Sequence, residues 1–436
     1  MAKFAGAFRV GAAHTERIIV SVLSRIELYH VAVPLPTPFR PAWIPGLPQT
    51  HNRFDLLRLV TDDGVEGWSA GPAMGGERRG LGDLLGPYLL GLDPTDIETV
   101  QQRLREMSYL GLRNAWIEPA FWDIKAKLAG LPLYRLLGGE DQPIRLYAST
   151  GQLRGPAARV EEVARRADEG FRSVKLRVHA DSLEEDIAQV EAVTKAFGDR
   201  IRIGVDANQG WRVTAVAKAP LWDRVRARRF ADACADLGVA WLEEPLAMDD
   251  YDGLAELTAA AKLPITGGEL HTAGWPELRM MIHRRCYDVF QPDAMFTGGV
   301  AQTLQVIEEC RAHGLRYTPH TWTNGIGFAV NLHLMAVGGD PDGFLEYPLD
   351  PPSWTPRFRD AILTEPFNHD RGTLSLPTGP GLGFTIDRSA LRRWGRRTSV
   401  ITAGRLALRT LRDKGPRVAA ELARTRRHTA GPRSTP

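Results

Sequence analysis

The sequence SVKLRV at residues 173–178 is followed by IRIGVD at 201–206, AWLEEP at 240–245 and PITGGE at 264–269. Each segment is short, rich in strand-forming residues and followed by a longer helical pattern. The same alternation occurs at four further segments, which are residues 144–149, 289–293, 315–320 and 343–347. The eight segments start 24 to 39 residues apart, the length of one βα unit, and predict an α/β fold with a (β/α) barrel, a modified TIM barrel.

Residues 24–143 have a different pattern, which is typical of a small α+β domain. Alternating apolar and polar residues predict strands at 25–33 and 53–60. Asp63-Gly64 predicts the turn of a hairpin that returns through a third strand. We therefore expect an N-terminal α+β capping domain that acts as a lid beside the barrel.

The proline-rich segment Pro34–Pro48 lies between the first two predicted strands. It carries Phe39, Arg40 and Trp43, which would suit a loop that closes over a substrate. A surface loop with a few packed aromatic side chains would have the same composition. Composition alone leaves both interpretations open.

Net charge divides the chain into an acidic body and a basic tail. Residues 387–436 contain 14 Lys and Arg residues against three acidic ones, and because the whole chain carries +3, residues 1–386 carry −8. We expect the tail to be poorly ordered, although its leucines would also suit an amphipathic helix on an anionic surface or a neighbouring subunit. The expected organisation is an N-terminal extension (1–23), the capping domain (24–143), the barrel (144–365), a segment returning to the capping domain (366–390) and the basic tail (391–436).

Composition also argues against several classes of protein. An acidic body disfavours nucleic-acid binding, which needs a basic face. Cys234, Cys286 and Cys310 are too few and too scattered for a disulfide framework or a zinc site. No stretch of about 18 apolar residues is present, and the apolar run 18–23 is too short for a signal peptide. We expect a cytoplasmic protein without a membrane span.

Three consecutive predicted strands end in carboxylates, which are Asp206, Glu243 and Glu269. Neighbouring strands lie about 4.8 Å apart, so these side chains would repel one another at the mouth of the barrel. A divalent cation removes that conflict, and an all-oxygen ligand set without cysteine favours Mg²⁺, with Mn²⁺ as a substitute. Glu244 is expected to point outward by alternation.

Alternation along residues 173–178 places Lys175 and Arg177 inside the barrel. Two buried cations facing three carboxylates would be stabilised by an anion bound to the metal, although a structural layer of ion pairs is the alternative. Asp293 and His320 end the sixth and seventh predicted strands, at residues 289–293 and 315–320. A carboxylate that holds one imidazole nitrogen leaves the other free to move protons.

Glu346, in the last predicted strand, is a further candidate. A carboxyl group kept protonated there could donate a hydrogen bond to a developing oxyanion.

In combination, these motifs resemble the enolase superfamily, and within it the mandelate racemase subgroup. The resemblance covers roughly residues 24–390. Its motifs follow the family's order, and they are Lys-x-Arg (175–177), Asp-Ala-Asn (206–208), Glu-Glu-Pro (243–245), Gly-Glu (268–269), Pro-Asp-Ala (292–294), Pro-His (319–320) and Leu-Glu (345–346).

The resemblance implies a role for each matching position. The three strand-end carboxylates look like the magnesium ligands, and Lys175 like the lysine that contacts the substrate carboxylate. His320 with Asp293 looks like the acid/base pair, and Glu346 like the hydrogen-bond donor. The segments Pro34–Pro48 and Gly71–Glu77 look like the lid loops that select the substrate, a small carboxylate. A homo-oligomer is also expected from the family.

One departure from the family pattern changes the expected reaction. Arg177 stands where the family has the second lysine of Lys-x-Lys, and a guanidinium is a poor base. Racemisation needs a base on each face of the α-carbon, whereas His320 is the one evident base. We therefore expect a lyase, an acid-sugar dehydratase of carbohydrate catabolism that forms a 2-keto-3-deoxy acid.

Two other functions stay open. A racemase, epimerase or cycloisomerase of the same subgroup could use Lys175 or Arg177 as its second base. A relative that has kept the metal site and lost catalysis could serve as a binding protein. The substrate cannot be read from the sequence, and the candidate contacts to it are Arg40, Trp43, His51, Arg53, Asn208, Trp322 and Asn324.

Overall fold

Eight parallel strands form a curled sheet in the computed structural model, which describes residues 21–73, 81–109, 114–211, 213, 216–219 and 221–429. Each of the eight predicted segments contributes one strand, so the barrel fold is confirmed. The strands are β4 (Ile144–Ser149), β5 (Ser173–Arg177), β6 (Arg202–Asp206), β7 (Trp241–Glu243), β8 (Ile265–Gly267), β9 (Val289–Phe290), β10 (Arg316–Tyr317) and β11 (Leu345–Pro348).

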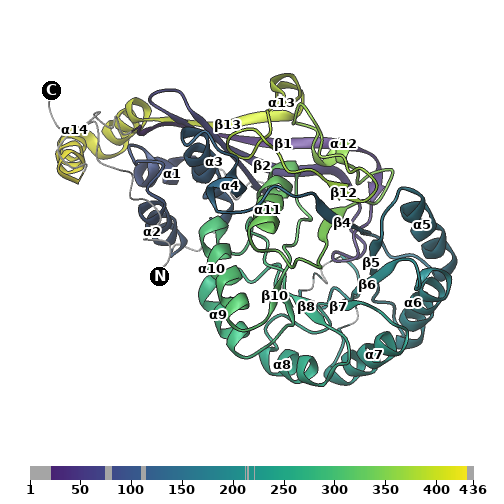
Figure 1. Cartoon of the computed structure of the whole chain (residues 1–436). Coiled ribbons are helices and arrows are strands. Elements are labelled where there is room, and N and C mark those ends of the chain that lie inside the picture. The colour runs from purple at the N-terminus through teal and green to yellow at the C-terminus, as the bar shows by residue number, and fades with distance from the viewer. Residues whose placement is uncertain are drawn as a thin grey trace.

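Helices surround this sheet (Figure 1). Each of the first seven strands is followed by a long helix, and β11 is followed by the one-turn helix α12 (Pro356–Arg359). The long helices are α5 (Pro156–Asp168), α6 (Leu183–Phe197), α7 (Arg224–Asp236), α8 (Tyr251–Ala260), α9 (Trp275–His283), α10 (Gly299–Ala312) and α11 (Gly325–Gly338). A short strand, β12 (Thr373–Leu374), pairs with the amino-terminal end of β4.

The barrel core consists of apolar side chains between the strands and the helices. Val174, Leu176 and Val178 lie in this core, as alternation predicts. Neighbouring strands approach closely where Gly204 of β6 faces Trp241 of β7: a Cβ on Gly204 would lie 2.1 Å from the indole ring. The glycine therefore gives the ring its space.

The capping domain consists of an antiparallel sheet and a group of helices. Its sheet contains β1 (Leu23–Phe39), β2 (Gln49–Thr61) and β3 (Glu66–Pro72), and the predicted hairpin joins β2 to β3. Strand β1 continues to Phe39, although its pairing with β2 is irregular between Pro34 and Phe39, so the proline-rich loop is shorter than expected and begins at Arg40. The helices are α1 (Leu81–Leu89), α2 (Ile97–Ser108), the 3₁₀ turn η2 (Ala115–Ile117), α3 (Pro119–Leu128) and α4 (Leu133–Leu136).

Glu118, at the start of α3, ties the capping domain to the barrel. Its fully buried carboxylate accepts hydrogen bonds from the backbone amides of Val300 (2.6 Å) and Ala301 (3.1 Å) in the first turn of α10. A carboxylate at a helix N-terminus satisfies free amides and opposes the helix dipole. A Cβ on Gly299 would lie 2.3 Å from this carboxylate, so the contact needs a glycine there.

The basic tail differs from our expectation. Residues 391–436 were expected to be poorly ordered, yet β13 (Gly395–Thr402) pairs with β1 and completes the capping sheet in the order β13-β1-β2-β3. Ile401 of this strand is buried against α1. The many arginines of the tail conceal this short strand, because only one of its apolar side chains needs to be buried.

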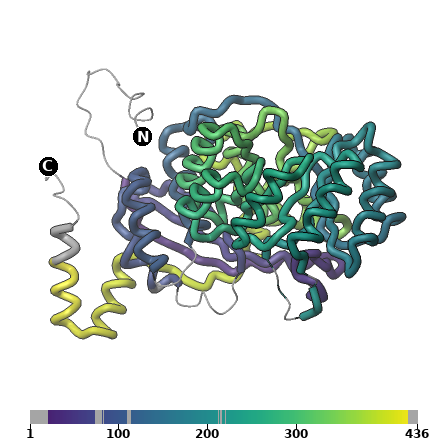
Figure 2. The backbone as a smooth tube through the Cα atoms, turned by 90° about the horizontal axis from the view of Figure 1, so that it is seen from below, coloured from purple at the N-terminus to yellow at the C-terminus, as the bar shows by residue number. Residues whose placement is uncertain are grey.

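Two helices flank β13. Helix α13 (Arg388–Trp394) precedes it, and α14 (Ala403–Thr429) follows it with a break at Gly415, where φ is +80°. Figure 2 shows α14 beside the capping domain and away from the barrel. The expected extension at residues 1–23 falls almost entirely outside the described residues. Within the described part of the chain, no helix has the length and apolar character needed to cross a bilayer.

His333 on α11 is a buried histidine that packs against the capping domain. Its Nδ1 accepts a hydrogen bond from the backbone amide of Tyr134 (3.1 Å), and the two rings stack with centroids 5.7 Å apart. Burial lowers the pKa of His333 to about 4. The folded protein therefore holds this imidazole in its neutral form.

We expect His333 to make stability fall as the medium becomes acidic. In the unfolded chain this imidazole takes up a proton near pH 6.5, whereas in the folded chain it does so near pH 4. The contribution of His333 to the free energy of unfolding is thus complete above pH 6.5. It is lost as the pH falls to about 4, and the total loss is roughly 3 kcal/mol. Urea unfolding of wild type and His333→Gln should show a difference in the free energy of unfolding that becomes smaller as the pH falls from 6.5 to about 4. A difference that does not change with pH would contradict the assignment.

Candidate active site

A cavity of about 1050 Å³ lies between the carboxyl ends of the barrel strands and the capping domain. On the barrel side it is lined by polar residues that include Arg177, Asn208, Glu269 and His320. On the capping side its wall is largely apolar, with Trp43, Phe54, Leu81, Leu84 and Trp116. This is the end of a (β/α) barrel at which active sites form.

Lys175 and Arg177 point into the barrel from β5, as predicted. Lys175 is fully buried, and its Nζ lies 2.6 Å from Glu243 Oε1, 2.8 Å from Glu346 Oε1 and 3.6 Å from Asp206 Oδ2. Burial alone would lower the pKa of Lys175, but the carboxylates of Glu243 and Glu346 raise it well above its usual value. Lys175 therefore stays charged beneath the floor of the cavity.

Arg177 is fixed by an ion pair, a hydrogen bond and two aromatic rings. It forms an ion pair with Asp206, and its Nε donates to the carbonyl of Thr150 (2.7 Å). Its guanidinium also lies 5.3 Å from the ring centre of Trp43 and 5.2 Å from that of Trp322. Burial alone would lower the pKa of Arg177, but Asp206 and other carboxylates raise it, so the group stays cationic.

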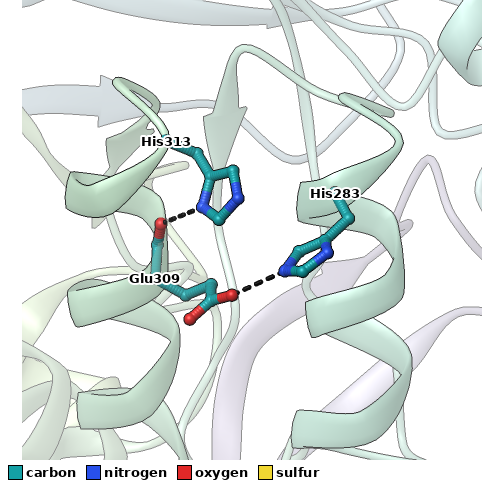
Figure 3. A group of neighbouring side chains, drawn as sticks. All are labelled: His283, Glu309 and His313. Atoms are coloured by element: carbon teal, nitrogen blue, oxygen red, sulfur yellow. Dashed lines mark hydrogen bonds and ion pairs between the residues drawn. The ribbon is translucent and has the colours of Figure 1, made fainter.

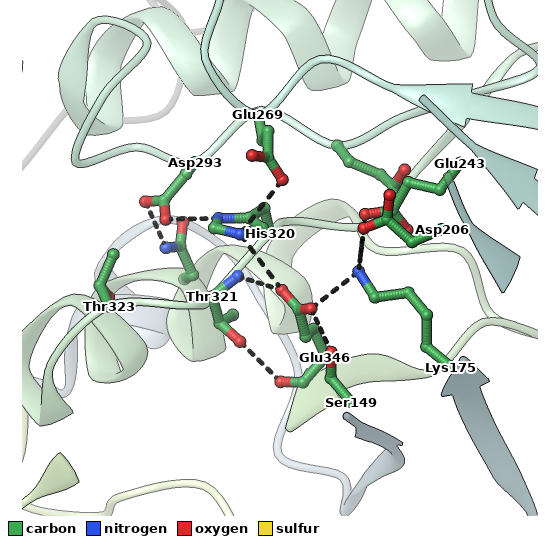
Figure 4. A network of polar contacts seen from close by, with 12 residues as sticks. Ser149, Lys175, Asp206, Glu243, Glu269, Asp293, His320, Thr321, Thr323 and Glu346 are labelled. Atoms are coloured by element: carbon green, nitrogen blue, oxygen red, sulfur yellow. Dashed lines mark hydrogen bonds and ion pairs between the residues drawn. The ribbon is translucent and has the colours of Figure 1, made fainter. Parts of the chain in front are cut away.

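The three predicted metal ligands all lie at the barrel mouth. Asp206 and Glu243 are register neighbours on β6 and β7, and Glu269 follows β8. The three carboxylates do not converge on one point. Asp206 and Glu243 turn toward Lys175 (Figure 4). Glu269 instead lies 3.2 Å from His320 Nε2 and accepts a hydrogen bond from Trp211 Nε1 at 2.9 Å. A cation bound by all three would draw them out of these pairs.

Glu244 was expected to point outward, and that expectation is wrong. Its backbone has a φ of +47°, which breaks the strand alternation, and its side chain is buried. Its Oε2 has no hydrogen-bond partner within the described part of the chain. Burial, followed by the nearby carboxylates of Glu269 and Asp206, raises the pKa of Glu244 well above its usual value.

The charges at the barrel mouth are unequal. The buried carboxyl groups are Asp206, Glu243, Glu244, Glu269, Asp293 and Glu346, whereas the buried permanent cations are Lys175 and Arg177. Even with Glu244 neutral and His320 protonated, the other five carboxyl groups outnumber the three cations. The unpartnered oxygen of Glu244 and this excess both fit a divalent cation, and a donor set made only of oxygens fits Mg²⁺.

His320 and Asp293 form the predicted pair. His320 Nδ1 lies 3.0 Å from Asp293 Oδ2, and Asp293 is itself fixed by the side-chain amide of Asn331 (2.8 Å) and the backbone amide of Met295 (2.9 Å). The Nε2 atom of His320 lies on the side of Glu269. Burial alone would lower the pKa of His320, but Glu269, Glu346 and Asp293 raise it to about 10. A bound cation that takes up the charge of Glu269 would lower this value again.

Glu346 does not fit the role of a protonated donor. It accepts hydrogen bonds from Ser149 Oγ (2.7 Å) and from the backbone amide of Thr321 (2.8 Å), and it pairs with Lys175. Burial alone would raise its pKa, but Lys175, His320 and Arg177 lower it below the usual value. Glu346 is an ionised acceptor that positions its neighbours.

The predicted substrate contacts fall into two groups. Trp43, His51, Arg53, Asn208, Trp322 and Asn324 line the cavity. Arg40 does not: its side chain is exposed, and its backbone amide donates to Gln152 Oε1 (3.2 Å). Of the lid segment Gly71–Glu77, residues 71–73 line the cavity and residues 74–77 lie outside the described residues.

Sequence reasoning missed several supporting residues. Gln291 donates to Glu243 Oε2 (3.0 Å), Asn331 holds Asp293, and Ser149 holds Glu346. Gln291 and Ser149 lie at the ends of barrel strands, so the rule that identified the carboxylates could also have found them. Asn331 lies within α11, and no strand-end pattern points to it.

Comparisons with known proteins agree with this architecture. Residues 25–138 match the family model of the mandelate racemase/muconate lactonizing enzyme N-terminal domain, and residues 158–390 match the enolase C-terminal domain-like model. The chain is 32% identical to D-galactarolactone cycloisomerase of Agrobacterium fabrum, over 78% of this chain and 92% of that one. It is 31% identical to L-talarate/galactarate dehydratase of Salmonella typhimurium, over 85% and 90%.

The solved structure of a dehydratase has the same fold as this chain. L-talarate/galactarate dehydratase from Salmonella typhimurium LT2, liganded with Mg and L-lyxarohydroxamate, superposes with a TM-score of 0.75. The match covers 90% of this chain and 97% of that chain at 28% identity.

We expect the carboxylates of the barrel mouth to bind Mg²⁺. Replacing Glu243 by Gln keeps an acceptor for Lys175 and removes one negative charge, so Mg²⁺ affinity should fall at least about tenfold. Isothermal titration calorimetry measures this change. Glu140→Gln removes an exposed carboxylate elsewhere and should leave affinity unchanged. Equal affinity in both variants would refute the site.

Proposed function

Because the chain belongs to the enolase superfamily, in its mandelate racemase/muconate lactonizing enzyme branch, we propose that it removes the proton next to a substrate carboxylate. With Mg²⁺ as cofactor, the favoured overall reaction is dehydration of an acid sugar to a 2-keto-3-deoxy acid. Mn²⁺ is a possible substitute. Curated relatives include L-talarate/galactarate, arabinonate and D-galactonate dehydratases.

His320 is the base in this proposal. Asp293 holds its Nδ1 at 3.0 Å, which fixes the tautomer and leaves Nε2 to take the proton from C2. The same imidazolium then gives that proton to the hydroxyl leaving from C3. The C2–H and C3–O bonds break, water departs, and the resulting enol tautomerises to the keto acid.

One observation carries the choice of dehydration: the position opposite His320 offers a fixed cation instead of a base. Arg177 is held by Asp206 and Thr150 and covered by Trp43 and Trp322. Lys175 is fully buried and is not among the described residues that line the cavity. Proton transfer on one face suffices for dehydration and not for racemisation.

Asp206, Glu243 and Glu269 would hold the Mg²⁺, with Glu244 beside them. The bound ion would supply charge stabilisation to the substrate carboxylate when the α-proton leaves. Arg177 contributes a second positive charge at the cavity floor, and Lys175 keeps Glu243 and Glu346 in place. Glu346 positions Ser149 and Thr321 as an ionised acceptor.

A second candidate is an isomerase of the same branch. D-galactarolactone cycloisomerase is 32% identical over most of its length, and L-Ala-D/L-Glu epimerase is a further relative at 26%. A binding protein without catalysis is less well supported, because the His320–Asp293 pair is complete. A cytoplasmic homo-oligomer without nucleic-acid partners remains our prediction.

Arg53 is the proposed contact to a second carboxylate. Among the described residues that line the cavity, Arg53 and Arg177 are the arginines, and Arg177 is already held. Talarate and galactarate carry a carboxylate at each end, so a relative's substrate has the group that Arg53 could meet. The apolar capping wall would contact the carbon chain between the two ends.

We expect His320→Asn to abolish turnover. Without the base, activity on a pool of mono- and diacid sugars should fall by about 10²- to 10⁴-fold, the range typical of general acid–base catalysis. Proton NMR in D₂O reads the reaction directly, because new 2-keto-3-deoxy signals report dehydration. Mg²⁺ titration and circular dichroism serve as controls for a folded variant. Full activity in His320→Asn would end the proposal, and loss of the α-proton signal without a keto acid would favour the isomerase.

We expect Arg53→Met to discriminate between diacids and monoacids. Loss of a charge-assisted contact should raise KM for a diacid sugar about tenfold and change KM for a monoacid by less than about twofold. Arg40→Met is the matched control, since the Arg40 side chain does not line the cavity. Steady-state kinetics with a diacid sugar and with a monoacid sugar measures both KM values. An equal change of the two KM values in Arg53→Met would exclude the contact between Arg53 and a second carboxylate.

A further inference from the structure

Two histidines and a glutamate form a cluster outside the barrel. His283 ends α9, whereas Glu309 lies in the last turns of α10 and His313 caps that helix (Figure 3). Both helices end here just before the chain enters β9 and β10. The cluster therefore lies at the amino-terminal ends of these strands, opposite the cavity, and belongs to no part of the site described above.

The cluster is arranged as metal ligands are. One ligand atom from each residue lies within 4.8 Å of the others. His283 Nε2 is 2.6 Å from Glu309 Oε1, and the two imidazole rings lie 4.7 Å apart between centres. His283 is 47% exposed and Glu309 22% exposed, so small side-chain rotations can bring the three atoms to the closer spacing of a tetrahedral site.

His313 is already oriented for binding. Its Nδ1 lies 3.0 Å from the backbone carbonyl of Glu309. Because a carbonyl only accepts, Nδ1 carries the hydrogen and Nε2 keeps a free lone pair. Metal-binding histidines generally have their second nitrogen held in this way, which fixes the tautomer and the ring.

The local charge also favours a cation. The C-terminal ends of α9 and α10 meet here, and helix C-termini carry partial negative charge. The carboxylate of Glu309 adds a further negative charge beside the two histidines. Arg279 Nε lies 3.6 Å from Glu309 in an exposed pair, which contributes little and can be displaced.

We propose that His283, Glu309 and His313 bind a divalent transition metal ion of the zinc type, with water in the remaining position. Two imidazoles and one carboxylate select such ions over Mg²⁺, which prefers oxygen ligands alone. The bound ion would link α9 to α10 and stabilise the barrel, without a part in the reaction at the other end.

Zinc titration of the full-length protein tests this assignment. Saturating Mg²⁺ is kept present, so that the barrel mouth is occupied, and binding is followed by calorimetry and by the visible absorption of Co²⁺ as a probe. We expect one Zn²⁺ site whose affinity falls at least about tenfold in His313→Ala and in Glu309→Gln. The thermal midpoint of wild type should rise with Zn²⁺.

Glu308→Gln is the matched control, because Glu308 is the exposed neighbour of Glu309 on the same helix. It removes the same charge and should bind Zn²⁺ as wild type does. Wild type that binds no Zn²⁺, or equal binding in wild type and His313→Ala, would overturn the proposal. Activity with Mg²⁺ should be the same in all four proteins, so this result is independent of the proposed reaction.

Discussion

Unequal buried charge at the barrel mouth is the constraint on which the site depends. Parallel strands bring their carboxyl ends together about 4.8 Å apart, and alternation turns every second side chain inward. Asp206, Glu243 and Glu346 share Lys175, and Asp206 also binds Arg177. A buried charge without its partner costs several kcal/mol, so each member of this network needs the others. A bound cation would offset the excess of carboxylates in this network.

Sequence patterns predicted the barrel because its period is regular. Each strand contributes a short apolar segment, each helix a longer one, and eight repeats leave few other architectures. The same regularity predicted that Lys175 and Arg177 point inward and that His320 meets Asp293. These residues sit on strands or at strand ends, where alternation and register determine which side chains are neighbours.

Other features could not be predicted because they depend on local backbone or on distant neighbours. Glu244 leaves the strand alternation through a left-handed backbone conformation, which no periodic pattern reveals. The ionised state of Glu346 follows from charges on other strands. Arg40 faces solvent because β1 extends as far as Phe39, so the loop that carries it is shorter than its prolines suggested.

Strand β13 joins two segments of the capping sheet that lie on either side of the barrel in the sequence. Its partner β1 begins at Leu23, whereas β13 spans Gly395–Thr402. During synthesis, the outer edge of β1 therefore lacks its partner until the whole barrel has left the ribosome. An unpaired strand edge invites pairing with other chains, and larger proteins expose such edges transiently as they fold. The nascent chain thus exposes this edge to aggregation until β13 has been made, and a chain truncated before Gly395 would keep that edge permanently.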